Sequence, residues 1–519
     1  MSRDISRRQV LIGGTALAGL AALPAAGGRP AFAAGHSQVA VRYTRDLQNL
    51  DPANRVGPEE ENLYMACCQF LARLKPGSTE WEPDAASKLT QVSDTEIDFE
   101  LKPGQMFQQG YGELTAEDVK FSFERFRKPG ADGKLPAFAD DWIALDHVEV
   151  TGQYTGKIIL KNPAPTIWLV GICDGSGTLL SKKAFAALGE AKMATTLIGS
   201  GPYQIEEWRP NEKVVLTRNP DWKGEKPHFD EFLIRPIQEI KTAELALKAQ
   251  EINFTEIDAA SAKDLAGDPN VEIMRRPGID YTWLGINMEK PPFTDLKVRQ
   301  AVRLAIDVDS IIQGAYGGTV DRARALVAPG LLGYWKDAPL YKYDPEAARK
   351  LLAEAGQGGG FSTTLTTLTD AGYLAAAQII QANLAEVGIT VKIDALDPGA
   401  YWALGADDKA KNVELVIVPY QSKLDSSFQT QWFTSKQIGI WNWQRWNSPE
   451  FDKLHDLANS TLDSKKREEA FIRMQQLMDE SACFIWITHE VHVYGHSKWL
   501  KPVILPNGPN WQFVDFEEA

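Results

Sequence analysis

The sequence predicts an α/β or α+β protein with two or three lobes, and three observations lead to this prediction. The chain has 519 residues, about three to four times the length of a typical domain. Its residues are 44% apolar and 24% charged, a composition of folded globular proteins. Strand-like and helix-like segments are mixed along the chain, and no repeat of 20 to 50 residues is present. These features exclude a disordered chain and a polytopic membrane protein.

The net charge and the cysteine content indicate which partners and which covalent cross-links to expect. The chain carries 55 Lys and Arg against 69 Asp and Glu, a formal net charge of -14. Because an acidic surface repels phosphate groups, we expect no nucleic acid as a partner. Four cysteines are too few for a disulfide framework in a chain of this size, so we expect buried free thiols, although one long-range bridge stays open: Cys67, Cys68, Cys173 and Cys483.

The first 33 residues are predicted to be an export signal. The stretch S-R-R-x-V-L, with Arg7 and Arg8, resembles the twin-arginine signal, although two chance arginines on an ordinary secretory signal remain an alternative. The apolar run 10–23 is shorter than the about 20 residues that a transmembrane helix needs. Residues 31–33 provide an Ala-Phe-Ala cleavage site before Ala34. We therefore expect a periplasmic protein, cleaved between Ala33 and Ala34 and without a lipid anchor.

Local patterns predict the individual elements. Alternating apolar residues favour strands at 39–43, 204–208, 213–218, 280–287 and 483–494. Apolar spacings of three and four favour helices at 63–74, 114–126, 241–250, 295–305 and 344–355. Pro76-Gly77 is expected to end the first helix, and Thr115 with two acidic residues is expected to cap the second. The glycine-rich run 356–360 is expected to be a loop.

Motifs of enzyme chemistry are scarce in this sequence. It contains no P-loop, no G-x-S-x-G, no C-x-x-C and no H-E-x-x-H. A metal site could be formed by three histidines that lie close together in the sequence, His489, His492 and His496. On a strand, however, the side chains of His489 and His492 point to opposite faces. His492 and His496 would lie about 13 Å apart at roughly 3.3 Å per residue, too far for one ion. We therefore predict no metal site, no cofactor and no catalytic residues.

Aromatic residues are the more informative feature. The sequence has 15 Trp and 14 Tyr, and several are grouped at 401–402, at Trp432 and at 441–446. Trp and Tyr side chains combine an apolar ring with an N–H or O–H group, so they suit a ligand pocket or an interface. The alternative is that most of them pack in the core.

Six stretches, in this order, resemble a known family: 47–53 (LQNLDPA), 111–126, 199–237, 284–312 (LGINMEKPPFTDLKVRQAVRLAIDVDSII), 343–356 and 446–454. The chain resembles the extracellular solute-binding proteins of family 5, the peptide, opine and nickel type of bacterial ABC importers. The resemblance covers nearly the whole chain after the export signal.

The resemblance implies an α/β, two-lobed, hinged periplasmic binding protein fold of type II-like architecture with an extra inserted subdomain. After the signal at 1–33, lobe I would comprise 34–65, 196–281 and 487–519, with the inserted subdomain at 66–195. Lobe II would comprise 282–486. The chain would cross between the lobes near 280–284 and 485–487. The implied partners are a small-molecule solute and an ABC transporter permease in the inner membrane, and we expect a monomer.

The resemblance also implies where a solute would bind. Leu47 would contribute the edge of lobe I, and Tyr401 would pack on the solute. Trp283 would lie at the beginning of lobe II. The loop 420–425 would face the cleft with Tyr420, Gln421, Ser422 and Asp425. Peptide-binding members carry an Asp that pairs with the peptide amine at the position that Ser422 holds here. We therefore expect an opine-like conjugate, a saccharide or another polar metabolite rather than generic peptides.

Arg445 is a further candidate for the binding site. It is flanked by Trp443 and Trp446, an arrangement that suits bidentate binding of a carboxylate. The alternative is that Arg445 pairs with Glu450 or Asp452 and that the tryptophans belong to the core. At the level of function, the alternatives to an importer protein are a secreted enzyme that reuses the fold and a receptor for a metal or metallophore.

Overall fold

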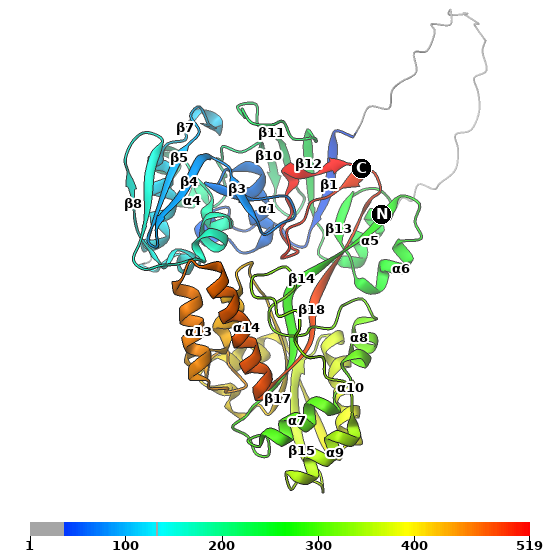
Figure 1. The fold of residues 1–519 in the computed structure, drawn as a ribbon. Coiled ribbons are helices and arrows are strands. Elements are labelled where there is room, and N and C mark those ends of the chain that lie inside the picture. The colour runs from blue at the N-terminus through cyan, green and yellow to red at the C-terminus, as the bar shows by residue number, and fades with distance from the viewer. Residues whose placement is uncertain (1–35, 131–132) are drawn as a thin grey trace, which may run out of the picture. The chain divides into compact units, whose positions relative to one another are not determined.

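Two long neighbouring strands connect the two halves of the fold. In the computed structural model, β14 (Val271–Ile286) pairs antiparallel with β18 (Phe484–Ser497) along most of its length (Figure 1). The pairing shifts register between Pro277 and Tyr281. Gly278 lies at this shift, where an added Cβ would meet the Glu490 carbonyl oxygen at 2.5 Å. A glycine is therefore required for the strands to approach each other at this point.

These strands belong to a ten-stranded mixed sheet. Its order is β10-β11-β12-β1-β13-β18-β14-β17-β15-β16. On one side of β14 and β18 lie β1 (Gln38–Tyr43), β10 (Tyr203–Arg209), β11 (Lys213–Arg218), β12 (Glu231–Pro236) and β13 (Phe254–Glu256). On the other side lie β15 (Phe361–Leu368), β16 (Ile389–Leu396) and β17 (Leu415–Tyr420). The structure describes residues 36–130 and 133–519, so the signal predicted for residues 1–33 lies outside the described residues.

A separate four-stranded antiparallel sheet has the order β4-β5-β9-β8. Its strands are β4 (Ala86–Ser93), β5 (Glu96–Leu101), β8 (Leu145–Val150) and β9 (Thr155–Leu160). The sheet packs with α2 (Ala116–Glu124), whose first turn is held by the Asp118 carboxylate, which accepts the Thr115 backbone N–H at 2.9 Å. Three short strand pairs complete the sheets: β2 (Ala72–Leu74) with β3 (Trp81–Pro83), β6 (Met106–Phe107) with β7 (Gly112–Glu113), and β19 (Leu500–Lys501) with β20 (Glu517–Glu518).

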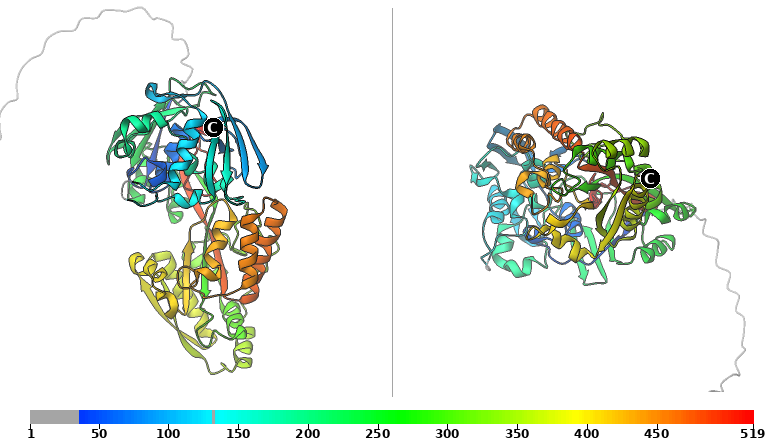
Figure 2. Two further views of the ribbon diagram at one scale, coloured as in Figure 1. Left: turned by 90° about the vertical axis from the view of Figure 1, so that its left-hand side faces the viewer. Right: turned by 90° about the horizontal axis from the view of Figure 1, so that it is seen from below.

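Helices cover both faces of the sheet around β14 and β17, and strand alternation decides which face each residue joins. Leu284 packs with α7 (Leu296–Ala305), α8 (Val308–Tyr316), α9 (Pro345–Glu354) and α10 (Ala371–Glu386). Its neighbour Trp283 packs with α13 (Pro449–Ser460) and α14 (Ser464–Ser481). The left view of Figure 2 shows the orange helices α13 and α14 on the opposite side from the yellow helices. Both faces are therefore buried, which explains the continuous apolar run at 283–286.

The remaining helices are shorter or lie in the half of the fold that contains β1. They are α1 (Pro58–Cys67), α3 (Lys182–Leu188), α4 (Glu190–Met193), α5 (Ile240–Lys248), α6 (Ala262–Leu265), α11 (Pro398–Trp402) and α12 (Ser426–Thr430). Within the described residues, no helix is long and apolar enough to cross a membrane. All four cysteines are buried and free.

Most predicted elements are confirmed, and two are corrected. The helix predicted at 63–74 is wrong in its second half, because α1 ends at Cys67 and Ala72–Leu74 forms β2. Long-range contacts override the helical periodicity there: the Cys67 carbonyl accepts the Gly201 N–H at 2.9 Å, and Asp84 accepts the Phe70 N–H at 2.8 Å. The strand predicted from residue 280 begins earlier, at Val271. The capped helices α2, α7 and α9 and the strands β1, β10, β11 and β18 are confirmed.

Candidate functional site

The candidate site lies at the edge where three parallel strands end. Strands β15, β16 and β17 run in the same direction, so their carboxyl ends meet at one edge of the sheet. Ligands of open α/β sheets bind outside such an edge. Helix α11 follows β16 there, and the loop 421–425 follows β17.

A group of partly exposed tryptophans surrounds Tyr420 at this edge. The ring centroids of Trp402, Trp432 and Trp441 lie 6.1, 6.4 and 6.2 Å from that of Tyr420. The Tyr420 hydroxyl donates to the Trp441 carbonyl at 2.7 Å and fixes the ring. Trp402 is 36% exposed, and the other two tryptophans are half-buried. We call Trp402, Trp432 and Trp441 the tryptophan surface.

Three of the predicted binding residues lie beneath this surface. Trp283 and Tyr401 are fully buried, and Trp443 is 1% exposed. The Tyr401 hydroxyl donates to the Ile417 carbonyl, and the Trp443 indole N–H donates to the Ile440 carbonyl at 2.8 Å. The polar groups of Tyr401 and Trp443 are therefore engaged in positioning the chain, whereas the buried Trp283 indole N–H has no hydrogen-bond partner among the described residues. Sequence reasoning selected the buried members of the groups 401–402 and 441–443 and missed their exposed neighbours.

Leu47 lies elsewhere. It is 4% exposed and packs in the hydrophobic core around β1 and β12, together with Tyr43 and Phe232. Leu47 therefore belongs to a different hydrophobic cluster from Trp432 and Trp441.

The Asp425 carboxylate is engaged in contacts within the fold. Its carboxylate accepts the Ser427 N–H at 2.9 Å and so caps the first turn of α12. The same carboxylate accepts two hydrogen bonds from the Arg467 guanidinium, at 2.8 and 2.9 Å, and both side chains are buried. Asp425 is thus already neutralised by a cation on α14.

Arg445 is also already paired. Its guanidinium contacts Glu289 at 2.6 Å and Asp408 at 2.5 Å. Neither Glu450 nor Asp452 is its partner, because Glu450 pairs with Arg473 and Asp452 accepts from Ser435. A solute carboxylate would have to displace two carboxylates from this guanidinium, so the arrangement offers no ready anion site.

The loop after Tyr420 approaches the point where β14 and β18 shift register. Gln421 is exposed, and the Ser422 N–H donates to the Asp280 carboxylate at 2.7 Å. Burial raises the pKa of Asp280 to about 7, although the hydrogen bond from Ser422 lowers it; the nearby Glu490 carboxylate makes a smaller contribution that raises it. Among the described residues, Asp280 has no salt-bridge partner. The position of Ser422 therefore adjoins a carboxyl group that strand β14 supplies.

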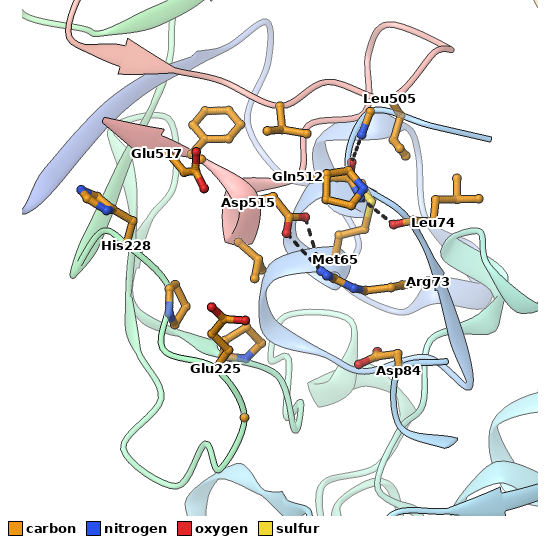
Figure 3. Close-up of a pocket in the computed structure, with 18 of the residues that line it drawn as sticks. Met65, Arg73, Leu74, Asp84, Glu225, His228, Leu505, Gln512, Asp515 and Glu517 are labelled. Atoms are coloured by element: carbon orange, nitrogen blue, oxygen red, sulfur yellow. Dashed lines mark hydrogen bonds and ion pairs between the residues drawn. The ribbon is translucent and has the colours of Figure 1, made fainter. Parts of the chain in front are cut away.

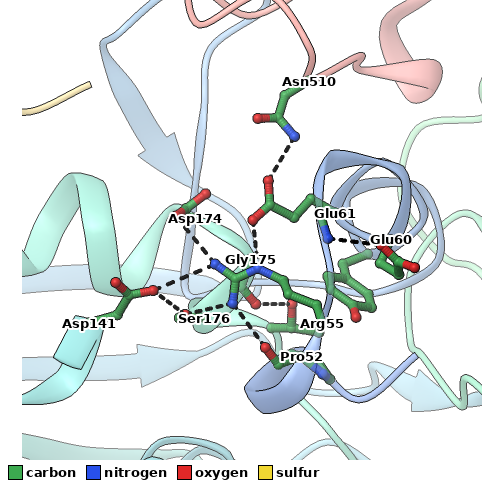
Figure 4. Close-up of polar contacts among 12 residues, drawn as sticks. Pro52, Arg55, Glu60, Glu61, Asp141, Asp174, Gly175, Ser176 and Asn510 are labelled. Atoms are coloured by element: carbon green, nitrogen blue, oxygen red, sulfur yellow. Dashed lines mark hydrogen bonds and ion pairs between the residues drawn. The ribbon is translucent and has the colours of Figure 1, made fainter. Parts of the chain in front are cut away.

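Lys423, the next residue of the loop, reaches a group of charged side chains near α1 and the four-stranded sheet. Its ammonium lies 2.9 Å from Asp141 and 3.6 Å from Asp174. Figure 4 shows that Arg55 lies between the same two carboxylates and Glu61, with its Nε 2.5 Å from Glu61. Burial, followed by the Glu61 charge, raises the pKa of Asp174 to about 6.

The histidines of β18 do not converge. His489 contacts the Leu326 carbonyl at 3.0 Å, His492 contacts Glu256 at 3.0 Å, and His496 contacts the Ser497 carbonyl at 3.0 Å. In the part of the chain that the structure describes, no three His, Cys, Asp or Glu side chains gather in a way that could hold a metal ion.

A large open cavity of about 1720 Å³ lies away from the predicted site. Figure 3 shows it between α1, the loop 221–228 and the C-terminal segment, with Arg73 paired to Asp515 at 3.3 Å and Gln512 donating to the Leu74 carbonyl. None of the predicted binding residues lines it. Its walls carry charges of both signs, so the cavity does not indicate one kind of ligand.

Comparisons with known proteins identify relatives over most of the chain. Residues 80–439 match the family described as "Bacterial extracellular solute-binding proteins, family 5 Middle". The dipeptide-binding protein of Escherichia coli K12 is 28% identical over 445 residues, which cover 81% of this chain and 83% of that protein. These matches agree with the resemblance seen in the sequence.

Solved structures extend the match to the fold. The ABC transporter-associated periplasmic binding protein DppA from Helicobacter pylori, in complex with the peptide STSA, is 26% identical, with a TM-score of 0.73 over 93% of this chain and 98% of that chain. HbpA2 from Haemophilus parasuis is 22% identical, with a TM-score of 0.85 over 93% of this chain and all of that chain. The predicted periplasmic binding protein fold is thereby confirmed.

The first prediction concerns Asp425 and Arg467. Arg467→Met removes the cation and leaves a buried carboxylate without its partner, so we expect the free energy of unfolding to fall by about 3 to 5 kcal/mol. Urea denaturation followed by circular dichroism measures this change. Arg473→Met on the same helix breaks an exposed pair with Glu450 and serves as the control, with an expected loss below about 1 kcal/mol. Equal losses in the two variants would contradict the structural role of the Asp425 pair.

The second prediction concerns the pH dependence of stability. The folded-state pKa of Asp280 lies near 7, whereas that of an unfolded Asp lies near about 4. The folded state therefore binds more protons in this window, and the group lowers the free energy of unfolding as pH rises through it. Asp280→Asn keeps an acceptor for the Ser422 N–H and should raise that free energy at pH 8 by about 1 to 3 kcal/mol, with little effect at pH 4. Urea denaturation at both pH values tests this, and parallel pH profiles would contradict it.

Proposed function

The chain belongs to the bacterial extracellular solute-binding proteins of family 5, the substrate-binding components of ABC importers, and from this premise we propose that it captures a small polar organic solute and delivers it to a permease in the inner membrane. Members of this family bind solutes and are not enzymes, so the alternative of a secreted enzyme is set aside. The alternative of a metal or metallophore receptor has no group of ligating side chains in its favour among the described residues.

The tryptophan surface is the observation that carries the proposal for the site. Three indole rings lie partly open to solvent around Tyr420, at the strand edge where α/β proteins bind their ligands. Buried neighbours, including Tyr401, Trp443 and Trp283, hold these rings in place. Such rigid aromatic faces suit stacking against a sugar ring or another flat, polar solute. Gln421 and Ser422 adjoin Tyr420 in the chain and supply polar contacts.

The chemical class of the solute follows from the charges near this surface. Arg445 and Asp425 are occupied by their own partners, and the position of the peptide-amine anchor holds the uncharged Ser422. We therefore favour an opine-like conjugate, a saccharide or another polar metabolite over generic peptides. The E. coli relative is named for dipeptides and the H. pylori structure holds a peptide, so a peptide is the direct competitor to test.

The hinge and the lobes are part of the same proposal. We retain lobe I at 34–65, 196–281 and 487–519, the inserted subdomain at 66–195 and lobe II at 282–486. The register shift between Pro277 and Tyr281 supports a hinge there, because unpaired strand residues absorb backbone rotation most easily. A solute that touches both lobes then favours the closed state by its differential affinity. We also propose that the protein acts as a monomer in the periplasm.

The third prediction tests the site. Mass spectrometry of the solute released from the purified protein by mild unfolding should identify a ring-containing polar metabolite. Calorimetry with that compound should then show one-to-one binding, and Trp402→Ala and Trp441→Ala should each weaken it by about 1 to 3 kcal/mol through lost stacking. Trp222→Ala, a half-buried tryptophan at the large cavity, is the matched control and should leave affinity unchanged. A loss confined to the control would place the site at the cavity instead.

The fourth prediction addresses peptides directly. Calorimetry with the tetrapeptide STSA and with dialanine should give dissociation constants weaker than the micromolar range, because no carboxylate occupies the position of Ser422. Ser422→Asp restores an acidic side chain there and should strengthen the binding of peptides with a free amine but not of N-acetylated peptides. Submicromolar affinity of the unmodified protein for either peptide would overturn the proposed solute class.

The fifth prediction concerns export. We propose that the twin-arginine pair directs export of the folded protein and that cleavage leaves Ala34 as the first residue. Arg7→Lys together with Arg8→Lys should abolish the appearance of the protein in the periplasmic fraction, whereas Arg29→Lys, outside the motif, should not. N-terminal sequencing of the exported protein should begin at Ala34. Normal export of the double variant would show that an ordinary secretory signal is used.

A further inference from the structure

One lysine joins the two proposed lobes by ion pairs. Lys423 belongs to the loop after β17 in lobe II, whereas Asp141 and Asp174 belong to the inserted subdomain of lobe I. Every other salt bridge between described residues joins two side chains on the same side of the register shift between Pro277 and Tyr281. The Lys423 pairs are therefore the ionic contacts that a separation of the lobes must break.

The surroundings of Lys423 make this contact specific. The side chains of Lys423 and Asp174 are each 24% exposed, and that of Asp141 is 10% exposed. The Lys423 ammonium also lies over the rings of Phe138, at 5.8 Å, and Phe428, at 5.6 Å. Phe138 comes from the lobe I side and Phe428 from lobe II, so the cation is enclosed by both lobes. A partly dehydrated cation between aromatic faces and carboxylates is held more firmly than a surface pair.

The carboxylates are held in place independently of Lys423. Ser176 donates to Asp141 at 2.6 Å. Arg55, whose side chain is fully buried, contributes a guanidinium 3.5 Å from Asp141 and 3.6 Å from Asp174. Figure 4 shows that Arg55 in turn is fixed by Glu61, which accepts from Asn510 at 3.0 Å. The receptor for Lys423 is thus preformed within lobe I and does not need lobe II to assemble.

Charge balance explains why the lobe I site attracts a cation. Arg55 contributes one positive charge, and Glu61, Asp141 and Asp174 contribute three carboxylates. Burial is the largest cause of the raised pKa of Asp174, about 6, and the negative charge of Glu61 is the second. The contribution from Glu61 reflects the excess of carboxylates over cations in this group. For Lys423, burial lowers the pKa, but the Asp174 and Asp141 charges outweigh burial and leave the pKa above its usual value. Withdrawal of Lys423 would leave the carboxylates short of a cation, at a cost in electrostatic energy.

We propose that Lys423 is a positioning residue for lobe closure: its ammonium docks into the site formed by Asp141, Asp174 and Arg55 and holds a closed arrangement of the lobes before any solute binds. The energy of this contact sets the population of closed, empty protein and therefore the fraction of molecules that a solute finds already closed. This inference rests on the proposed hinge between the lobes, but it needs no knowledge of the solute.

The experiment measures the distance between the lobes without added solute. Nitroxide labels are attached at Glu149→Cys, on β8 of the inserted subdomain, and at Lys465→Cys, on α14 of lobe II, both exposed positions. The protein is first freed of any retained solute by unfolding and refolding, and pulsed electron resonance then gives the distance distribution. Lys423→Met should increase the population at longer distances by about fivefold, and Lys423→Glu should increase it further. Lys423→Arg keeps the charge and should restore the distribution of the unmodified protein.

Matched controls separate this role from general stability. Lys182→Met breaks a lysine–carboxylate pair with Glu117 inside the inserted subdomain and should leave the distribution unchanged. Asp174→Asn removes one docking carboxylate without touching lobe II and should lengthen the distances as Lys423→Met does. If the Lys423 variants fold poorly, Asp174→Asn carries the test. Distributions of Lys423→Met and Asp174→Asn that both match the unmodified protein would overturn the proposal.

The outcome is distinguishable from a failure of the proposed function. If a solute binds at the tryptophan surface while the distance distributions stay unchanged, the inference about Lys423 alone is wrong. If the distances lengthen as expected while no solute is found, the contact between the lobes stands and the proposed function is wrong.

Discussion

The pairing of β14 with β18 is the constraint on which the rest of the structure depends. These strands give the two halves of the fold a common backbone, and each half then adds its own strands outward from them. The pairing shifts register between Pro277 and Tyr281, where Gly278 lies, and again between Thr282 and Trp283. Paired strand residues lie on either side of these shifts, so a hinge as proposed above would involve only a few residues. Asp280, beside the first of these shifts, accepts the Ser422 N–H and so connects the candidate binding loop to the proposed hinge.

The binding surface follows from this scaffold by a second constraint, the alternation of side chains along β14 and β17. Trp283 and Val418 point to the face covered by α13 and α14, whereas Leu284 and Ile417 point to the face covered by α7 to α10. Because both faces are filled, aromatic residues at the strand ends have no further core to enter. Trp402 and its neighbours therefore remain at the edge, with buried rings behind them. Exposed aromatic side chains on a rigid support are well suited to binding.

The sequence was sufficient for features that depend on local order and insufficient for those that depend on distant contacts. Caps such as Asp295 and Asp344 and the alternation in β1 are local, and the predicted elements there are confirmed. The second half of the helix predicted at 63–74 does not form, because the N–H of Gly201, more than a hundred residues away, donates a hydrogen bond to the Cys67 carbonyl. Exposure is equally non-local. Adjacent aromatic residues such as Tyr401 and Trp402 look alike in a sequence, and only the packing decides which one meets solvent.

The partners of charged residues also depend on distant contacts, so the local sequence does not predict them. Arg445, Asp425 and Lys423 all have partners at least 37 residues away, and nothing in their local sequence identifies those partners. For Arg445 and Asp425, both partners lie in the same half of the fold, so the pairs stabilise that half and leave no charge for a solute. For Lys423, the partners Asp141 and Asp174 lie on the other side of the proposed hinge, so under the proposal above the same kind of contact would act on the relation between the two halves. On this proposal, an ion pair stabilises one half of the fold when both its side chains lie on the same side of the register shift between Pro277 and Tyr281, and it acts on the relation between the halves when they lie on opposite sides.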